Sequence, residues 1–159
     1  PYFGTAVNSL DPYIFRSQIT PATAVGLEPG RQENGVARFL RLVSGWRTAA
    51  PYYYGDYYPL TPYTTSTADW LAWQFNRPGD SDGLVQAFRR PESSIETSRY
   101  VLRGLDAAAR YRVTDIDTPA TARVYSGKEL MERGLPVTIT NKPGAVIITY
   151  KKEAAGKTR

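Results

Sequence analysis

The 159-residue sequence contains no cysteine and no histidine. Their absence excludes disulfide bonds, Cys/His zinc sites, thiol nucleophiles, haem ligation through histidine and every Ser-His-Asp triad. No apolar run approaches the ~20 residues that a membrane-spanning helix requires. No basic start is followed by the apolar segment of a signal peptide. The chemistry that remains is that of carboxylates and aromatic surfaces, and we expect no metal site, no cofactor and no membrane partner.

Charge is modest for a chain of this length. The sequence has 20 Lys and Arg against 15 Asp and Glu, with 42% hydrophobic residues, which is typical of a globular domain. Most of the net charge of +5 comes from the last nine residues, and we interpret residues 153–159 as a basic tail. No nucleic-acid-binding motif is present, so we expect no such partner. The missing cysteine and signal peptide are compatible with the cytoplasm but leave the location open.

Helical signals precede residue 66. Residues 31–48 are predicted to form an amphipathic helix, because apolar side chains recur with the helical period. This stripe consists of Val36, Phe39, Leu40, Val43 and Trp46. A short strand over residues 2–10 and a loop at Asp11-Pro12 are expected before the helix, which gives an incomplete α/β unit. One such unit cannot cover both faces of its strand, so we expect the stripe to be exposed and to favour self-association without a partner.

Residues 51–66 form a tyrosine- and proline-rich junction. Pro51, Pro59 and Pro62, with Gly55, exclude a continuous helix and argue against a central strand. We therefore expect an irregular crossover that buries its rings. Tyrosine rings also offer flat faces on which sugars can stack. Two interpretations stay open for Tyr52–Tyr63: packing between domains, and a carbohydrate-binding surface.

The pattern changes to a period of two from Trp70 onward. Turn signals at residues 78–83 and 141–144 separate alternating runs, and Lys128–Glu132 is expected to form a helical turn stopped by Gly134. The predicted strands cover residues 70–75, 84–88, 98–103, 110–116, 120–125, 135–140 and 145–151. We therefore predict a mainly β fold, an antiparallel β-sandwich preceded by an incomplete α/β segment.

Catalysis without histidine or cysteine would rest on carboxylates. A glycosidase needs two of them, roughly 5–9.5 Å apart. Asp11 and Asp56 are candidates because each lies in a loop beside tyrosines. Each is also explained by capping or filling a turn. Asp80 and Asp82 lie at a predicted hairpin tip and lack the spacing of a calcium loop.

Several segments together resemble the C-terminal region of the glycoside hydrolase family 36 α-galactosidases, which are melibiase-like enzymes. The most specific strings are YYYGDYYPLT at Tyr52–Thr61 and WLAWQFNRP at Trp70–Pro78. Weaker matches follow the same order along the chain: LDPYIFRS at 10–17, GLVQAFRR at 83–90, SGKELM at 126–131 and GLPV at 134–137.

The resemblance implies a place in a larger enzyme. Family members combine an N-terminal β-domain, a (β/α)₈ catalytic barrel and a C-terminal antiparallel β-sandwich. Residues 1–50 would be the end of the barrel, 51–66 the junction, 67–152 the sandwich and 153–159 the tail. The implied partner is the barrel of the parent glycosidase. An α-galactoside ligand and a homo-oligomer are further alternatives.

The resemblance transfers no catalytic residue. The family is retaining, and both of its catalytic aspartates lie in barrel segments before the matched region. Ser81-Asp82 shares two letters with the acid/base context but lies at a hairpin tip. We therefore expect the chain alone to be inactive. Asp11, Tyr13 and Arg16 would lie at the ligand-facing end of the barrel if their loop follows its last strand, and we predict that they bind carbohydrate.

Overall fold

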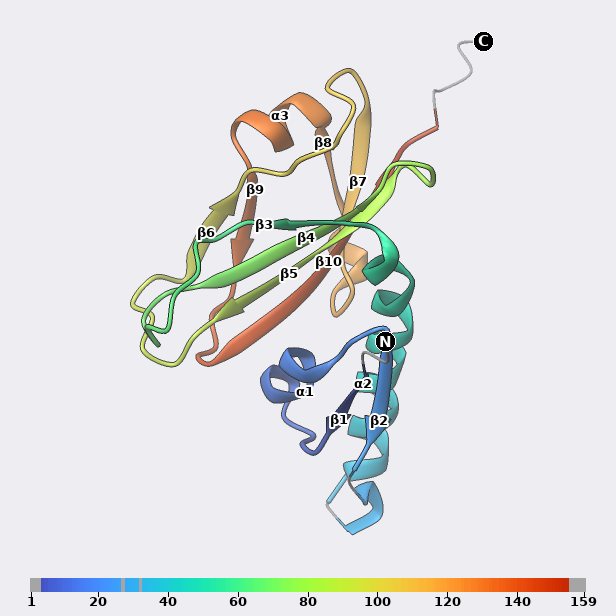
Figure 1. The fold of residues 1–159 in the computed structure, drawn as a ribbon, viewed down its shortest axis with the longest axis vertical. Coiled ribbons are helices and arrows are strands. Elements are labelled where there is room, and N and C mark those ends of the chain that lie inside the picture. Colours follow the sequence, from blue (N-terminus) through green and yellow to red (C-terminus); the bar gives the residue numbers. More distant parts are fainter. Residues whose placement is uncertain (1–3, 27, 32, 155–159) are drawn as a thin grey trace.

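The structure, a computed structural model, describes residues 4–26, 28–31 and 33–154. An α/β unit at the N-terminus packs against a larger β-sandwich, as Figure 1 shows. The sandwich contains most of the strands, so the fold is mainly β, as predicted. No helix among the described residues has the length and apolar character needed to cross a membrane.

The N-terminal unit contains two strand–helix pairs. β1 (Gly4–Val7), α1 (Pro12–Gln18), β2 (Ala22–Val25) and α2 (Gly35–Ala49) follow one another, and β1 pairs with β2 in parallel. The sequence predicted one strand, a loop at Asp11-Pro12 and one helix. The prediction of a loop was wrong, because α1 begins at Pro12. Residues 1–3 of the predicted strand lie outside the described residues. Pro12 suits the first turn of a helix, where its missing N–H costs no hydrogen bond.

The long helix begins later than expected. A 3₁₀ turn, η1 (Pro29–Arg31), comes first, and α2 begins at Gly35 after its N-cap residue Asn34, which has a left-handed φ of 53°. Of the predicted apolar stripe, Val36 and Leu40 are exposed, at 54% and 60%. The buried face of α2 is rotated toward Leu42 and Ala49. The residues of the stripe that pack against the core are Phe39, Val43 and Trp46.

The junction is more ordered and less buried than its sequence predicted. It forms a 3₁₀ helix, η2 (Ala50–Tyr54), and a strand, β3 (Asp56–Pro59), at the edge of a sheet. An edge position agrees with the expectation that its prolines exclude a central strand. The expected burial of the rings was wrong for Tyr54, Tyr57 and Tyr63, which are 82%, 57% and 93% exposed. Among the described residues, no further strand pairs with the outer edge of β3.

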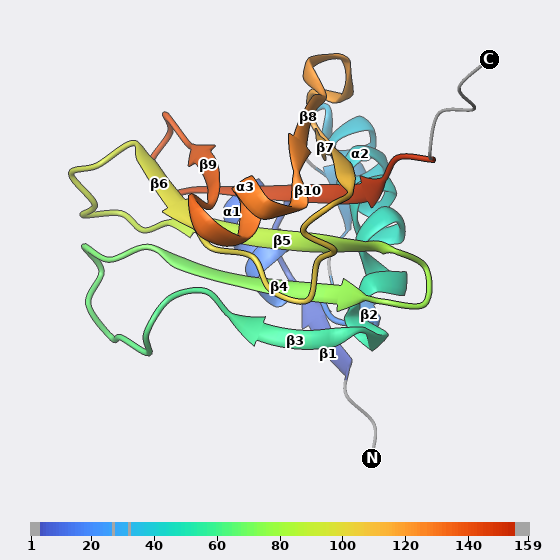
Figure 2. The same cartoon turned by 90° about the horizontal axis from the view of Figure 1, so that it is seen from above.

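The seven strands predicted after Trp70 are all present. They are β4 (Leu71–Arg77), β5 (Asp82–Arg89), β6 (Thr97–Tyr100), β7 (Arg110–Asp115), β8 (Arg123–Ser126), β9 (Leu135–Thr138) and β10 (Gly144–Lys152). A six-stranded antiparallel sheet has the order β3-β4-β5-β10-β7-β8, and β6 pairs with β9 in a second layer. Figure 2 shows these strands from above.

Short connections complete the sandwich, and one of them is the helical turn predicted at Lys128–Glu132. α3 (Gly127–Glu132) begins where the Ser126 hydroxyl accepts a hydrogen bond from the N–H of Glu129, at 3.0 Å. Gly134 follows with a φ of +78°, a conformation that favours glycine and ends the helix. A short 3₁₀ turn, η3 (Pro119–Thr121), lies between β7 and β8, so the strand predicted over residues 120–125 begins only at Arg123. Residues 139–143 connect β9 to β10; the turn predicted at 141–144 lies largely within this connection, but the strand predicted over 135–140 ends at Thr138.

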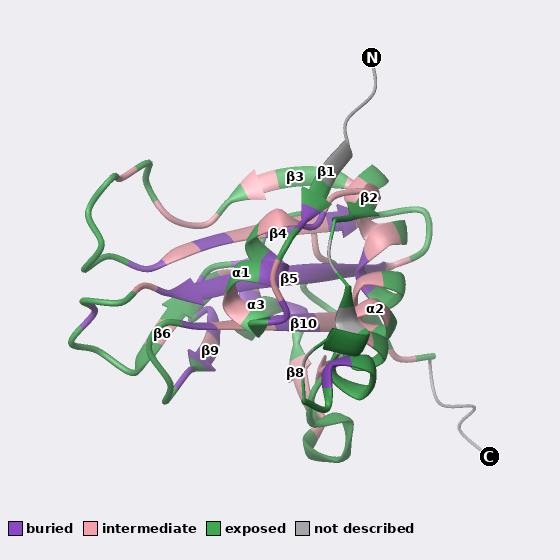
Figure 3. Ribbon diagram, turned by 90° about the horizontal axis from the view of Figure 1, so that it is seen from below, coloured by how far each residue is buried: buried purple, intermediate pink, exposed green. Residues whose placement is uncertain are grey.

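The six-stranded sheet separates two apolar cores. One lies between the sheet and the layer of β6, β9 and α3, and it includes Trp70, Val85, Tyr100, Leu130 and Tyr150. The other lies between the opposite face and the helices α1 and α2, and it includes Phe15, Leu42, Leu84 and Ile147. β5 lies between both cores and is buried along its whole length, as Figure 3 shows. The α/β unit therefore shares a core with the sheet.

Buried tyrosines predict a loss of stability in alkali. Burial raises the pKa of Tyr100 to about 12 and raises the pKa values of Tyr53 and Tyr150 as well, from the ordinary value of 10.0. The folded chain then keeps phenolic protons that the unfolded chain loses above pH 10. Stability is therefore complete below about pH 10 and falls as pH rises through the folded pKa values.

Urea titrations between pH 9 and 11.5, followed by circular dichroism, would measure this loss. The midpoint is expected to fall steadily above pH 10. Tyr150→Phe should make the decline shallower, whereas Tyr63→Phe, which alters an exposed ring, should leave it unchanged. A midpoint that does not depend on pH over this range would contradict the prediction.

Candidate functional site

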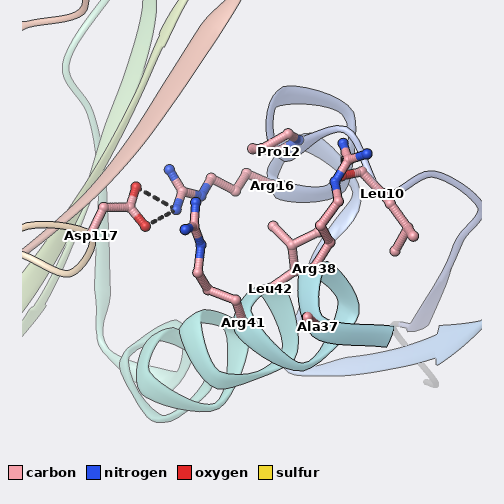
Figure 4. A pocket seen from close by; sticks show the side chains of 8 residues that line it. All are labelled: Leu10, Pro12, Arg16, Ala37, Arg38, Arg41, Leu42 and Asp117. Atoms are coloured by element: carbon pink, nitrogen blue, oxygen red, sulfur yellow. Dashed lines mark hydrogen bonds and ion pairs between the residues drawn. The ribbon is translucent and has the colours of Figure 1, made fainter. Parts of the chain in front are cut away.

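A groove with charged walls lies where α1 meets the sheet. It consists of two neighbouring cavities of about 320 Å³ and 470 Å³. Both are lined by Pro12, Arg16, Arg41 and Asp117. Figure 4 shows the smaller cavity, with Arg16 reaching from α1 toward Asp117 across the space above α2. The groove thus lies between the α/β unit and the loop that follows β7.

Arg16 is the central residue of the groove. Its side chain is buried, and Nη2 donates to both carboxylate oxygens of Asp117 at 2.7 Å. Nη1 donates to the backbone oxygen of Ala145 in β10, at 2.6 Å. From β5, Gln86 Nε2 donates to the backbone oxygen of Arg16 at 3.3 Å. Arg16 therefore connects α1 to three parts of the sandwich, and its charge is compensated within the fold.

Asp11 and Tyr13 line the larger cavity together with Arg16. The exposed carboxylate of Asp11 caps α1 by accepting a hydrogen bond from the N–H of Ile14, at 2.9 Å. The ring of Tyr13 is half-buried and meets the ring of Phe88 edge-on, with 5.7 Å between centroids. The structure thus gathers the three residues predicted to bind carbohydrate, and that role remains a prediction.

The carboxylates proposed as a catalytic pair are not brought together. Asp11 lines the groove beside α1, whereas Asp56 lines a separate cavity at the start of β3. Asp115 and Asp117 lie in the groove instead, and burial raises the pKa of Asp115 above its ordinary value. Among the described residues, no cluster of three or more acidic side chains could hold a metal ion.

Sequence reasoning missed the partner of Arg16. Asp115 lies near the end of the strand predicted over residues 110–116 and Asp117 directly follows it, at a place where acids are common in turns. Arg16 and Asp117 are 101 positions apart in the chain, and no local pattern connects them. Their contact arises because α1 packs on the face of the sheet beside β10. The arrangement joins the α/β unit to the sandwich through an ion pair in which Arg16 is buried and Asp117 is exposed.

Comparison with known proteins identifies the sandwich. Residues 70–149 match the family model described as the glycosyl hydrolase family 36 C-terminal domain. The chain belongs to this family. The match runs from Trp70 into β10, so it covers the seven strands predicted for the sandwich, β10 up to residue 149, and leaves out the edge strand β3 of the junction. The search of curated proteins found no match.

Solved structures resemble this family 36 domain in fold. One is a substituted form of the family 36 α-galactosidase AgaA from Geobacillus stearothermophilus in complex with stachyose. It shares 19% sequence identity with this chain and has a TM-score of 0.69. The similarity covers 94% of this chain and 21% of that one. A raffinose complex of the same enzyme shows 20% identity and a TM-score of 0.66, over 84% and 18% of the two chains.

A third similar structure is the galactosidase domain of the α-galactosidase-sucrose kinase AgaSK. It shares 22% identity with a TM-score of 0.64, over 82% of this chain and 18% of that one. The family 36 chain described here thus spans about a fifth of the length of the solved structures it resembles. The coverage of 94% in the stachyose complex exceeds the sandwich alone, so the shared fold includes the α/β unit.

Proposed function

We propose that this chain is the non-catalytic C-terminal part of an α-galactosidase-like retaining glycoside hydrolase, which packs on the catalytic barrel. Residues 1–50 would supply the last strands and helices of the barrel, 51–66 the junction, 67–152 the sandwich and 153–159 a tail. Family membership and the resemblance to α-galactosidases support this function.

The observation that carries the proposal is the parallel pair formed by β1 and β2. Parallel strands are found almost only in sheets with both faces covered. Val7 points toward the helices and is buried, whereas Ala6 and Ala24, which pair on the other face, are exposed. Two consecutive strand–helix units with one bare face of small side chains are what the last units of a (β/α)₈ barrel would present to the barrel interior.

The contacts of α1 suggest what the sandwich contributes. Phe15 and Arg16 fix α1 against β5 and β10 of the sheet. In a barrel, the loops that follow strands carry the substrate-binding residues. Asp11 and Tyr13 follow β1, so we retain them, with Arg16 as their neighbour, as the residues nearest to an α-galactoside. The sandwich would hold this last part of the barrel in place.

Two measurements test the proposal: the sequence of the coding region upstream of Pro1, and an assay of hydrolysis. The proposal expects the reading frame upstream of Pro1 to encode a barrel with two catalytic aspartates. It also expects the full protein, and not this chain, to hydrolyse an aryl α-galactoside. A reading frame without a barrel would refute it. So would turnover by this chain alone that Asp11→Asn or Asp56→Asn abolishes.

A further inference from the structure

A second cleft lies at the tip of the β4–β5 hairpin, beside η2. It measures about 380 Å³, and its functional groups come from Tyr54, Asp56, Arg77 and Asp80. None of these residues lines the groove around Arg16. Figures 1 and 2 show the hairpin tip next to the segment that joins α2 to β3. The residues that line the cleft therefore belong to the junction and the sandwich, and none of them lies in residues 1–50.

The backbone between Tyr54 and Asp56 is held tightly against the hairpin. Gly55 donates its N–H to the backbone oxygen of Tyr52, at 2.9 Å. A Cβ at Gly55 would lie 2.6 Å from the backbone oxygen of Asn76, so only glycine permits this approach. The two residues that flank Gly55 are thus set at a fixed place beside β4.

Arg77 fixes the opposite wall. It donates to both carboxylate oxygens of the buried Asp82 at 2.8 Å and forms an ion pair with Asp80 at 3.2 Å. Its guanidinium also lies over the ring of Tyr52, 4.4 Å from the centroid. Arg77 therefore orients Asp80 while its own charge is balanced by Asp82.

Two groups at the cleft are left free to bind a ligand. The ring of Tyr54 is 82% exposed, and within the described residues neither its hydroxyl nor the exposed Asp56 carboxylate has a hydrogen-bond partner. The two preceding tyrosines already have partners within the fold. The Tyr52 ring lies under the Arg77 guanidinium, and the Tyr53 hydroxyl donates to Gln86 Oε1 at 3.0 Å. Tyr54 is thus the ring whose face is available at the cleft.

We propose that this cleft binds a neutral pyranose ring of an oligosaccharide. The apolar C–H face of the sugar would stack on Tyr54, and its hydroxyls would donate to the carboxylates of Asp56 and Asp80. The two carboxylates disfavour anionic ligands, because the single arginine nearby is already paired with Asp82. The site goes beyond the proposed function, since it involves neither the barrel nor a catalytic step.

Titration of this chain with raffinose, followed by ¹H–¹⁵N NMR, would test the proposal. We expect saturable binding in the millimolar range, with the largest shifts at residues 54–56 and 77–80. Tyr54→Ala and Asp56→Asn should each weaken binding at least fivefold, and Tyr54→Phe, which keeps the ring, should retain it. Tyr63→Ala is the matched control, because Tyr63 is exposed but lies outside the cleft. Galacturonate should bind more weakly than galactose.

No saturable shift up to 50 mM raffinose would overturn the proposal, and so would binding that survives both Tyr54→Ala and Asp56→Asn. If Tyr54→Ala does not fold, Asp56→Asn and Tyr54→Phe still decide the question. The outcome is independent of the proposed function. A reading frame without a barrel would refute that function and leave this site intact, whereas failure here would leave the barrel assignment unaffected.

Discussion

Asp117→Ala is expected to destabilise the protein by about 2 kcal/mol, because it leaves the buried guanidinium of Arg16 without its carboxylate. The Arg16 side chain is 8% exposed, whereas Asp117 is 40% exposed and lines the groove. Water from the groove therefore replaces only part of the lost interaction. The backbone oxygen of Ala145 would be the remaining acceptor. Urea unfolding at pH 7, followed by tryptophan fluorescence, would measure the effect.

Two further variants make this prediction specific. Glu28→Ala removes an acid from the exposed ion pair with Arg31 and should change stability by less than about 0.5 kcal/mol. Arg16→Met combined with Asp117→Ala removes both charges and should recover much of the loss. If Asp117→Ala cost no more than Glu28→Ala, the ion pair would not hold the two units together.

Phe15→Ala is expected to have an effect of similar or larger size, about 3–5 kcal/mol. Phe15 is 1% exposed and lies in the core that α1 and α2 share with Leu84 and Ile147 of the sheet. Truncation leaves a cavity at the contact between the two units. We therefore expect α1 and its neighbours to detach before the sandwich unfolds.

Limited proteolysis together with urea unfolding would detect this order of events. Phe15→Ala should expose residues 4–49 to rapid cleavage while the sandwich persists. Ile14→Ala, on the same helix but 41% exposed, should cost less than about 1 kcal/mol and leave the cleavage pattern unchanged. Equal protease resistance of the two variants would show that the α/β unit does not depend on this core.

The strands of the sandwich could be predicted because their signals are local. Alternation identified β4 as a strand, and the turn residues at 78–83 place the return strand β5. It did not identify the buried face, because Gln74 and Asn76 are buried whereas the apolar residues that alternate with them are half-buried. The prolines of the junction excluded a central strand, and β3 indeed lies at an edge. The WLAWQFNRP string lies inside the region that matches the family 36 C-terminal domain.

The elements of the N-terminal unit were harder to predict. α1 spans seven residues and β2 four, too few for a hydrophobic period to be recognised. The apolar stripe predicted for α2 had the helical period, but the predicted buried face was wrong. Leu42 faces the core, whereas Val36 and Leu40 are exposed. Helical periodicity alone does not reveal which neighbouring surface the helix will meet.

The sequence by itself determined the sandwich, its turns, its family resemblance and the chemistry that the missing histidine and cysteine exclude. Only the tertiary structure decided that Arg16 is held by Asp117, that Asp11 and Asp56 line separate cavities, and that Tyr54 is exposed beside a free carboxylate. The physical reason is distance along the chain. Periodicity and turn chemistry act over a few residues, whereas ion pairs and exposure depend on which distant surfaces pack together.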